Sequence, residues 1–217
     1  QATFPGPYQY VTGDAGYKLF SSTVIFKTAG TKYIRATGDT KTGTKYVLVA
    51  SSGAVSLIVS MNTPATAGVS NSITIEAKDL YGNRATAYYS IAGGGGGGGT
   101  TGGGLTITSV DPIMTVDGAN PCTLAALDAG YKVYDGKVTL KSKSDNCWVK
   151  FADVGNSGIS GTKTGIVVLG GSPDHIVVTN LAASIVAGSN DNTVVVKIED
   201  FNNNLSDLYS GQITFSA

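Results

Sequence analysis

The sequence predicts an all-β protein, and three observations lead to that fold class. β-branched residues and tyrosine are abundant, whereas helix formers are scarce, and glutamate occurs only at positions 76 and 199. Several segments alternate apolar and polar residues, which is the period of a half-buried strand. Turns rich in glycine, asparagine and proline separate these segments.

The first 60 residues predict four strands. An extended segment with Pro5 and Pro7 opens the chain, and a turn at residues 14–18 follows it. In the first strand Val24 and Phe26 share one face. The expected strands, separated by glycine-containing turns and loops, cover residues 19–27, 32–37, 45–50 and 55–60.

The most regular strand lies within residues 67–89. Ile73, Ile75 and Ala77 alternate with polar residues, so we expect these three side chains to face a core. A polar turn from Asp79 to Asn83 follows, and Tyr88 comes five residues after that asparagine. The segment therefore predicts a strand, a tight turn and a second strand.

Two sequence patterns occur twice, which indicates an internal repeat. The strand and turn return in residues 187–209, where Val194, Val196 and Ile198 take the inward positions and Asp200 lies 121 residues after Asp79. The motif Asp-Ala-Gly-Tyr-Lys occurs at 14–18 and again at 128–132, an offset of 114. Two kinds of module therefore alternate along the chain.

Charge and hydropathy exclude two classes of partner. The 15 basic and 15 acidic residues balance, so no electrostatic surface for nucleic acid is expected. No apolar run approaches the roughly 20 residues of a membrane-spanning helix. We predict no nucleic-acid partner and no membrane span.

The residues that usually perform catalysis form no pattern. His175 is the one histidine and has no serine or cysteine partner that the sequence identifies. Glu76 and Glu199 lie on expected solvent faces, so they do not make a pair for glycoside hydrolysis. We predict no enzyme, no catalytic residue and no cofactor.

The two polar turns contain the only candidate metal ligands. Asp79 with Asn83, and Asp200 with Asn204, offer oxygen atoms of the kind that calcium prefers. Two acids are few for a tight site, and such residues commonly cap turns through side-chain to backbone bonds. They are weak calcium candidates, and the capping role is the preferred interpretation.

The repeated motifs resemble the bacterial Ig-like tandem repeats of large surface proteins. The matching stretches read ITIEAKDLYGN at 73–83, DAGYKVYDGKVTLKS at 128–142 and GIVVL at 165–169. The chain departs from the pattern where Asn203 replaces Gly82 and where glycines interrupt residues 93–104. The resemblance implies Ig-like β-sandwich domains and an extracellular or cell-surface location.

In that family the Asp-Leu-Tyr-Gly-Asn module precedes the Asp-Ala-Gly module, so this chain is out of phase with the domain. Residues 54–171 are then one complete Ig-like domain with a glycine-rich insertion at 93–104. Residues 1–53 are the C-terminal half of a domain, and residues 172–217 are the N-terminal half of another. Each half would expose strand edges and half of a core.

Three explanations of these halves stay open. They pair within one chain, the tail of one subunit completes the head of the next, or the sequence is one period of a longer repetitive polypeptide. The last two produce a fibre, because contacts that do not close make open filaments.

We therefore expect a structural subunit of an extracellular filament or surface array, with copies of itself as partners. Assembly would proceed head to tail by strand complementation. The alternative is an adhesin or carbohydrate-binding repeat segment that recognises surface glycans. The expected assembly residues lie near the two ends: Gln1, Phe4, Tyr8, Tyr10, Tyr209, Ile213 and Phe215.

The two cysteines occupy positions where the first copy of the repeat has tyrosines. At the offset of 114, Cys122 aligns with Tyr8 and Cys147 with Tyr33. For an extracellular protein we predict a Cys122–Cys147 disulfide, which would contribute on the order of 3 kcal/mol. The alternative is two buried free thiols.

The glycine run is the low-complexity feature of the chain. We expect Gly93, Gly96 and Gly99 to pack against a neighbouring subunit, where missing side chains allow close approach. The alternative is a flexible loop on its own domain.

Overall fold

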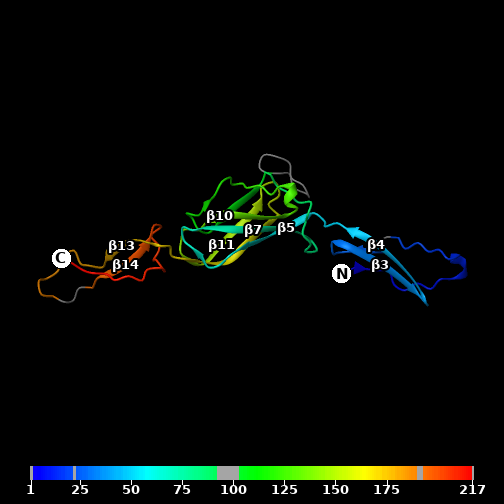
Figure 1. Ribbon diagram of the computed structural model, residues 1–217, viewed down its shortest axis with the longest axis horizontal. Helices are drawn as coiled ribbons and strands as arrows, with labels where there is room; N and C mark the ends of the chain where they lie inside the picture. Colours follow the sequence, from blue (N-terminus) through cyan, green and yellow to red (C-terminus); the bar gives the residue numbers. More distant parts are fainter. Residues whose placement is uncertain (1, 22, 92–102, 190–192, 217) are drawn as a thin grey trace.

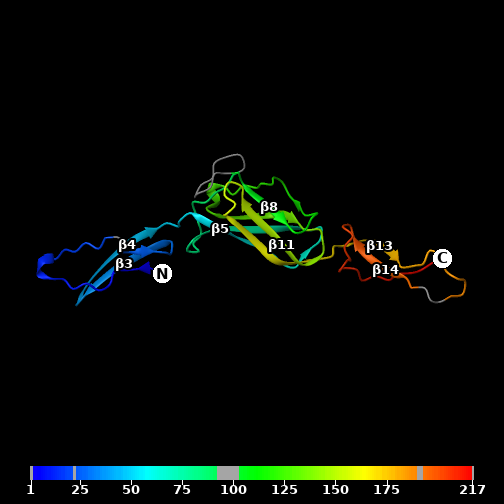
Figure 2. The same ribbon diagram turned by 180° about the vertical axis from the view of Figure 1, so that it is seen from behind.

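The computed structural model describes residues 2–21, 23–91, 103–189 and 193–216. The described chain is all-β apart from two short 3-10 turns, which confirms the predicted fold class. It forms three parts in a row (Figures 1 and 2). We call residues 54–169 the central body, residues 2–50 the head and residues 173–216 the tail.

The central body contains two four-stranded sheets. The first has the spatial order β5 (Ala54–Met61), β7 (Ser70–Asp79), β10 (Tyr131–Thr139), β9 (Thr115–Val116). The second has the order β6 (Ala65–Thr66), β12 (Ser160–Leu169), β11 (Ser144–Asp153), β8 (Leu105–Ser109). All neighbouring strands are antiparallel except β6 and β12, which are parallel.

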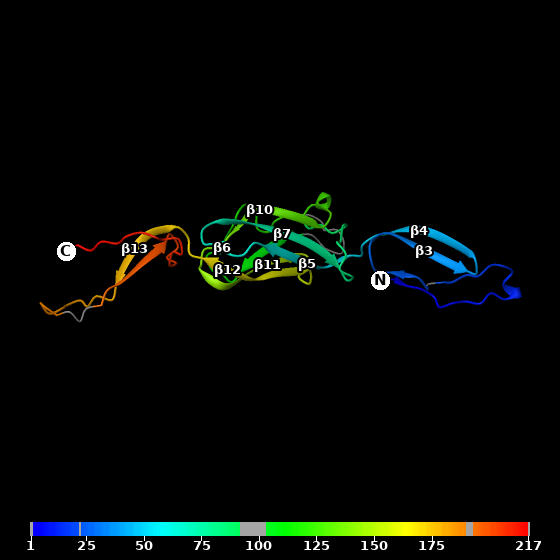
Figure 3. The ribbon, with the colours of Figure 1, turned by 60° about the horizontal axis from the view of Figure 1, so that its bottom comes forward.

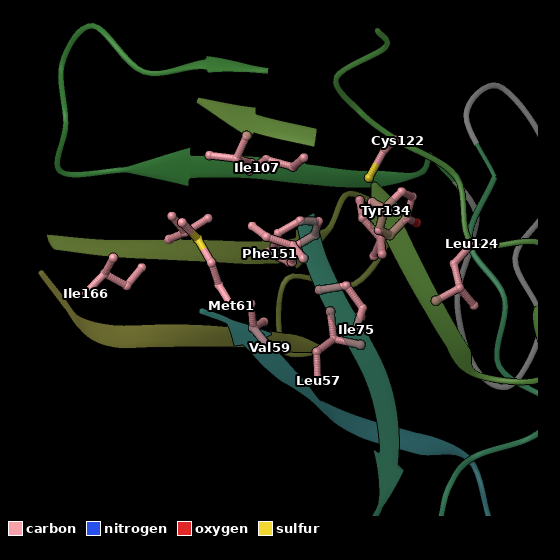
Figure 4. Packing of buried hydrophobic residues seen from close by; sticks show 14 of the residues in the cluster. Leu57, Val59, Met61, Ile75, Ile107, Cys122, Leu124, Tyr134, Phe151 and Ile166 are labelled. Carbon is pink, nitrogen blue, oxygen red and sulfur yellow. The ribbon is translucent and has the colours of Figure 1, made fainter. Parts of the chain in front are cut away.

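One hydrophobic core fills the space between these sheets. Ile73, Ile75 and Ala77 are fully buried, as their alternation with polar residues predicts. Side chains of both sheets meet in this core, among them Leu57 and Phe151 (Figure 4).

Gly161 lets the two sheets approach closely. A Cβ atom at this position would lie 2.0 Å from the carbonyl oxygen of Leu57 on β5, which is far inside van der Waals contact. β12 therefore packs directly against β5.

The head contains two separate strand pairs. β1 (Ala2–Thr3) pairs with β2 (Ile25–Phe26), and β3 (Gly30–Gly38) pairs with β4 (Lys41–Val49). The expected strand at 19–27 is wrong for most of its length, because only Ile25 and Phe26 are in a strand. In the central body the equivalent strand β10 is held by β7, and no described strand takes that place in the head.

The tail contains one strand pair, β13 (Pro173–Thr179) with β14 (Val195–Asp200). Residues 207–216 belong to no strand. Head and tail lie on opposite sides of the central body (Figure 3). In this structure the two halves therefore do not pair within one chain.

Candidate assembly surfaces

The tail hairpin repeats the first hairpin of the central body in the same register. Each has a register irregularity at its start, next to the aspartate that ends the second strand. The matching inward pairs are Leu57 with Ala77 and Val59 with Ile75 in the central body, and Ile176 with Ile198 and Val178 with Val196 in the tail.

Burial of these equivalent residues differs sharply. Leu57 is 3% exposed and Val59 7%, whereas Ile176 is 53% exposed and Val178 59%. The difference arises because β11 and β12 cover β5 in the central body, while no described strand covers β13. The tail therefore presents an open apolar sheet face.

The head hairpin repeats the second hairpin of the central body. Gly30 pairs with Val49 at one end of the head hairpin and Gly38 pairs with Lys41 at the other. In the central body the same two pairings are Ser144 with Val168 and Ala152 with Ser160. β3 therefore corresponds to β11 at an offset of 114, and β4 corresponds to β12 at an offset of 119.

The head hairpin is also open where its counterpart is covered. Tyr33 is 57% exposed, whereas the equivalent Cys147 is 1% exposed. Val47 is also exposed, whereas Ile166 at the offset of 119 is fully buried. In the head Val47 pairs with Lys32, so it lies on the other face from Tyr33. The outer edge of β3 pairs with no strand in the described parts of the chain, although β11 pairs there with β8.

Two hollows lie between the head hairpin and the aromatic residues of the first 26 residues. One, of about 330 Å³, lies between the rings of Tyr8 and Tyr10 and the far end of the hairpin, residues 36–38 and 41–43. The other, of about 420 Å³, is lined by residues that include Phe4, Phe26 and Tyr33. The head therefore has hollows lined by aromatic residues next to a hairpin whose β3 has one unpaired edge in the described chain.

The central body contains a buried hydrogen bond whose donor has its counterpart in the tail and whose acceptor has its counterpart in the head. Tyr88 donates its hydroxyl to Asp153 Oδ2 at 2.6 Å. Burial and this hydrogen bond to a carboxylate raise the pKa of Tyr88. The equivalent residues are Tyr209 in the tail and Asp39 in the head, and Tyr209 donates instead to the carbonyl oxygen of Gln212 at 3.3 Å.

An asparagine side chain fixes each junction between adjacent parts. Asn83 Nδ2 donates to the carbonyl oxygen of Lys27 at 2.9 Å, and the amide of Ala29 donates to Asn83 Oδ1 at 3.0 Å. Asn204 makes the equivalent pair of bonds with the carbonyl of Lys141 and the amide of Lys143, at 2.6 and 2.8 Å. We call these two contacts the asparagine clamps.

In each clamp the asparagine side chain also donates hydrogen bonds to a buried aspartate, Asp79 or Asp200. Asp79 accepts hydrogen bonds from the amides of Ser52, Tyr81 and Asn83, at 2.8 to 3.0 Å. Burial raises the pKa of Asp79, but these bonds and the Asn83 side chain outweigh burial and lower it to about 2. Asp200 has the same arrangement, and its pKa is also lowered.

The candidate calcium ligands are therefore the hydrogen-bonding groups of the two turns. The carboxylates of Asp79 and Asp200 hold amide donors, and Asn83 and Asn204 hold the neighbouring part of the chain. Within the described ranges, no group of three or more His, Cys, Asp or Glu side chains could hold a metal ion.

The predicted disulfide is wrong, because both cysteines are buried free thiols. Leu105 pairs with both Cys122 and Asp153, and Cys147 lies six residues from Asp153 along β11. At about 3.3 Å per residue the two cysteines are about 20 Å apart. A disulfide needs Cα atoms within about 7 Å.

The remaining predicted site residues fall into two groups. Phe4, Tyr8, Tyr10, Tyr209 and Phe215 are exposed, and Ile213 is partly buried. The residues that lie outside the described part of the chain are Gln1, Gly93, Gly96 and Gly99.

His175 contacts the acidic side chains of Asp174 and Glu199 at the exposed start of β13. No helix in the described ranges has the length and hydropathy needed to cross a membrane.

Sequence reasoning missed the asparagine clamps. The signal was present, because an asparagine follows each repeated aspartate by four residues and a lysine recurs at 27 and 141. No family model and no curated protein matches the chain.

Proposed function

We propose that this chain is a structural unit of an extracellular filament or surface array. In it, the tail of one unit and the head of another complete a second domain like the central body. One observation carries the proposal: the two hairpins that pack together in the central body recur separately at opposite ends. The tail hairpin keeps the register of its counterpart and has an open apolar face, and the head hairpin keeps the end pairings of its counterpart.

The proposal includes an Ig-like sandwich for the complete domain. The orders β5-β7-β10-β9 and β12-β11-β8 correspond to the ABED and GFC sheets of such domains. β6 is a short addition to the second sheet. The resemblance of the repeated motifs to bacterial Ig-like tandem repeats supports the same assignment and a cell-surface location.

The head and the tail contain counterparts of different strands of the central body. The tail supplies the counterparts of β5 and β7, and the head supplies those of β9, β11 and β12 and, as the short β2, part of the counterpart of β10. Burying the remaining exposed area of Ile176 and Val178 would contribute about 1 to 1.5 kcal/mol each, because each side chain is already nearly half buried. Because the two surfaces differ and lie at opposite ends, their contact repeats without closing and builds a filament.

The proposal is tested by the assembly state of the full chain. Light scattering after size-exclusion chromatography, with negative-stain electron microscopy, should show polymers of the 217-residue chain. Deleting residues 205–217 should abolish assembly and leave the central body folded, because the deletion removes only tail residues. Leu127→Ser, at the most exposed large apolar residue of the central body, is the control and should assemble normally.

Two outcomes would contradict the proposal. One is a full chain that stays monomeric at all concentrations, and the other is filaments that persist after the deletion.

A glycan-binding or adhesin segment is the second candidate. It is favoured by an exposed aromatic pair on the head, Tyr33 and Tyr46, whose ring centroids lie 6.0 Å apart. Binding of the deletion variant to a glycan array, lost in Tyr46→Ser, would support this function. The proposed assembly predicts no such binding.

A further inference from the structure

We infer that residues 209–216 of one unit insert as an edge strand beside β3 of another unit, in the place that β8 takes beside β11. The inference rests on the proposed function, because it names the contact through which head and tail join.

The central body shows how this position is filled. β8 runs antiparallel to β11, with Leu105 opposite Asp153 and Ile107 opposite Phe151. On its other side Leu105 exchanges both backbone hydrogen bonds with Cys122, at 2.8 and 2.9 Å. The strand is thus held between β11 and the segment that contains Cys122.

The same position is open in the head. The counterpart of Asp153 is Asp39 and the counterpart of Cys122 is Tyr8. A hollow of about 330 Å³ separates Tyr8 from the end of the hairpin, and β3 has no partner strand on its outer side in the described chain. An unpaired edge of this kind accepts an added strand through its backbone groups.

The tail segment has the pattern that this position requires. Residues 213–217 read Ile-Thr-Phe-Ser-Ala, and residues 105–109 read Leu-Thr-Ile-Thr-Ser. Both alternate large apolar with small polar residues, so Ile213 and Phe215 take the inward positions of Leu105 and Ile107.

The glycine-rich insertion does not disturb this correspondence. The amide of Gly103 donates to the carbonyl oxygen of Ile91 at 3.0 Å, so the chain returns next to the point at which the insertion begins. The tail has no insertion and passes from Tyr209 to Ile213 within a few residues.

The correspondence defines a register and a side-chain contact. Thr214 lies opposite Gly38 and Ser216 opposite Ala36, as Thr106 lies opposite Ala152 and Thr108 opposite Lys150. On assembly the hydroxyl of Tyr209 leaves the carbonyl oxygen of Gln212 and donates a hydrogen bond to the carboxylate of Asp39 of the other unit. Tyr88 donates to Asp153 in the same way in the central body.

Paired cysteines test the register in the full chain. In a background of Cys122→Ala and Cys147→Ala, the predicted pairs are Ser216→Cys with Ala36→Cys and Thr214→Cys with Gly38→Cys. The matched controls, called the exchanged pairs, combine Ser216→Cys with Gly38→Cys and Thr214→Cys with Ala36→Cys. In each control the two cysteines lie two residues away from the predicted register. After mild oxidation, non-reducing gels should show ladders of linked chains for both predicted pairs, at least tenfold stronger than for the exchanged pairs.

The outcomes separate this inference from the proposed function. Assembly with ladders in the exchanged pairs, or with no ladders, overturns the strand insertion while head-to-tail assembly stands. Absence of assembly in the unsubstituted chain overturns both.

Discussion

The central body and the two ends of the chain contain the same hairpins, but only the central body buries them. Leu57 and Ile176 have equivalent places in hairpins of identical register, and their exposed fractions are 3% and 53%. The tail hairpin therefore keeps the pairing and register of its counterpart without a facing sheet. Burial requires the facing sheet, which the ends lack in the described chain.

A second contrast shows what else depends on tertiary contacts. The repeated motif Asp-Ala-Gly-Tyr-Lys makes the same 3-10 turn in both copies, with Ala15 and Ala129 at positive φ. The strand that follows forms in full only as β10, because β7 lies beside it. The turn is a local property, whereas the strand needs a neighbour.

The largest expected effect comes from truncating equivalent core positions. Leu57→Ala should lower the free energy of unfolding of the central body by about 2 to 5 kcal/mol, because it leaves a cavity. Ile176→Ala should leave that transition unchanged and weaken assembly. Chemical denaturation and sedimentation measure the two effects, and an equal loss of stability from both variants would remove the distinction.

Removing the hydroxyl of each equivalent tyrosine sharpens the comparison. Tyr88→Phe should lower the stability of the central body by about 1.5 to 3 kcal/mol, since it leaves Oδ2 of the buried Asp153 without its hydroxyl donor. Tyr209→Phe should not change that stability but should weaken association about tenfold or more. Normal association of Tyr209→Phe would show that Asp39 is not its partner.

Acid should weaken the junction between head and central body. Because the folded pKa of Asp79 is about 2, below its usual 3.8, its contribution is complete above pH 4 and is lost as the pH falls through 2. The loss is about 2 kcal/mol. In Asp79→Asn the pH dependence of unfolding between pH 5 and 1.5 should decrease by this amount, while the contribution of Asp200 stays. An unchanged dependence would contradict the assignment.

Removing an asparagine clamp should have an effect no larger than that of acid. Asn83→Ala removes two hydrogen bonds to the head, worth about 1 kcal/mol each. The distance distribution between spin labels in the head and central body should broaden, while the central body to tail distribution stays narrow. Asn204→Ala should reverse this result, and if neither variant broadens a distribution the clamps do not hold the junctions.

Sequence reasoning succeeded where the controlling interactions are local. The alternation of Ile73, Ile75 and Ala77 correctly predicted the buried face of β7. It failed where distant segments decide: aligning Cys122 and Cys147 with two tyrosines gave no measure of their separation along the sheet. The clamps were missed for a related reason, since nothing local shows that Asn83 contacts residues 27–29.

The central claim is that tail and head are two parts of one domain, and joining them in that order tests it most directly. A polypeptide of residues 172–217, a three-residue Gly-Ser linker and residues 1–53 should unfold in one cooperative thermal transition and give dispersed amide resonances. Each half alone should give neither. A joined polypeptide that remains unfolded, without a cooperative transition, would contradict the account.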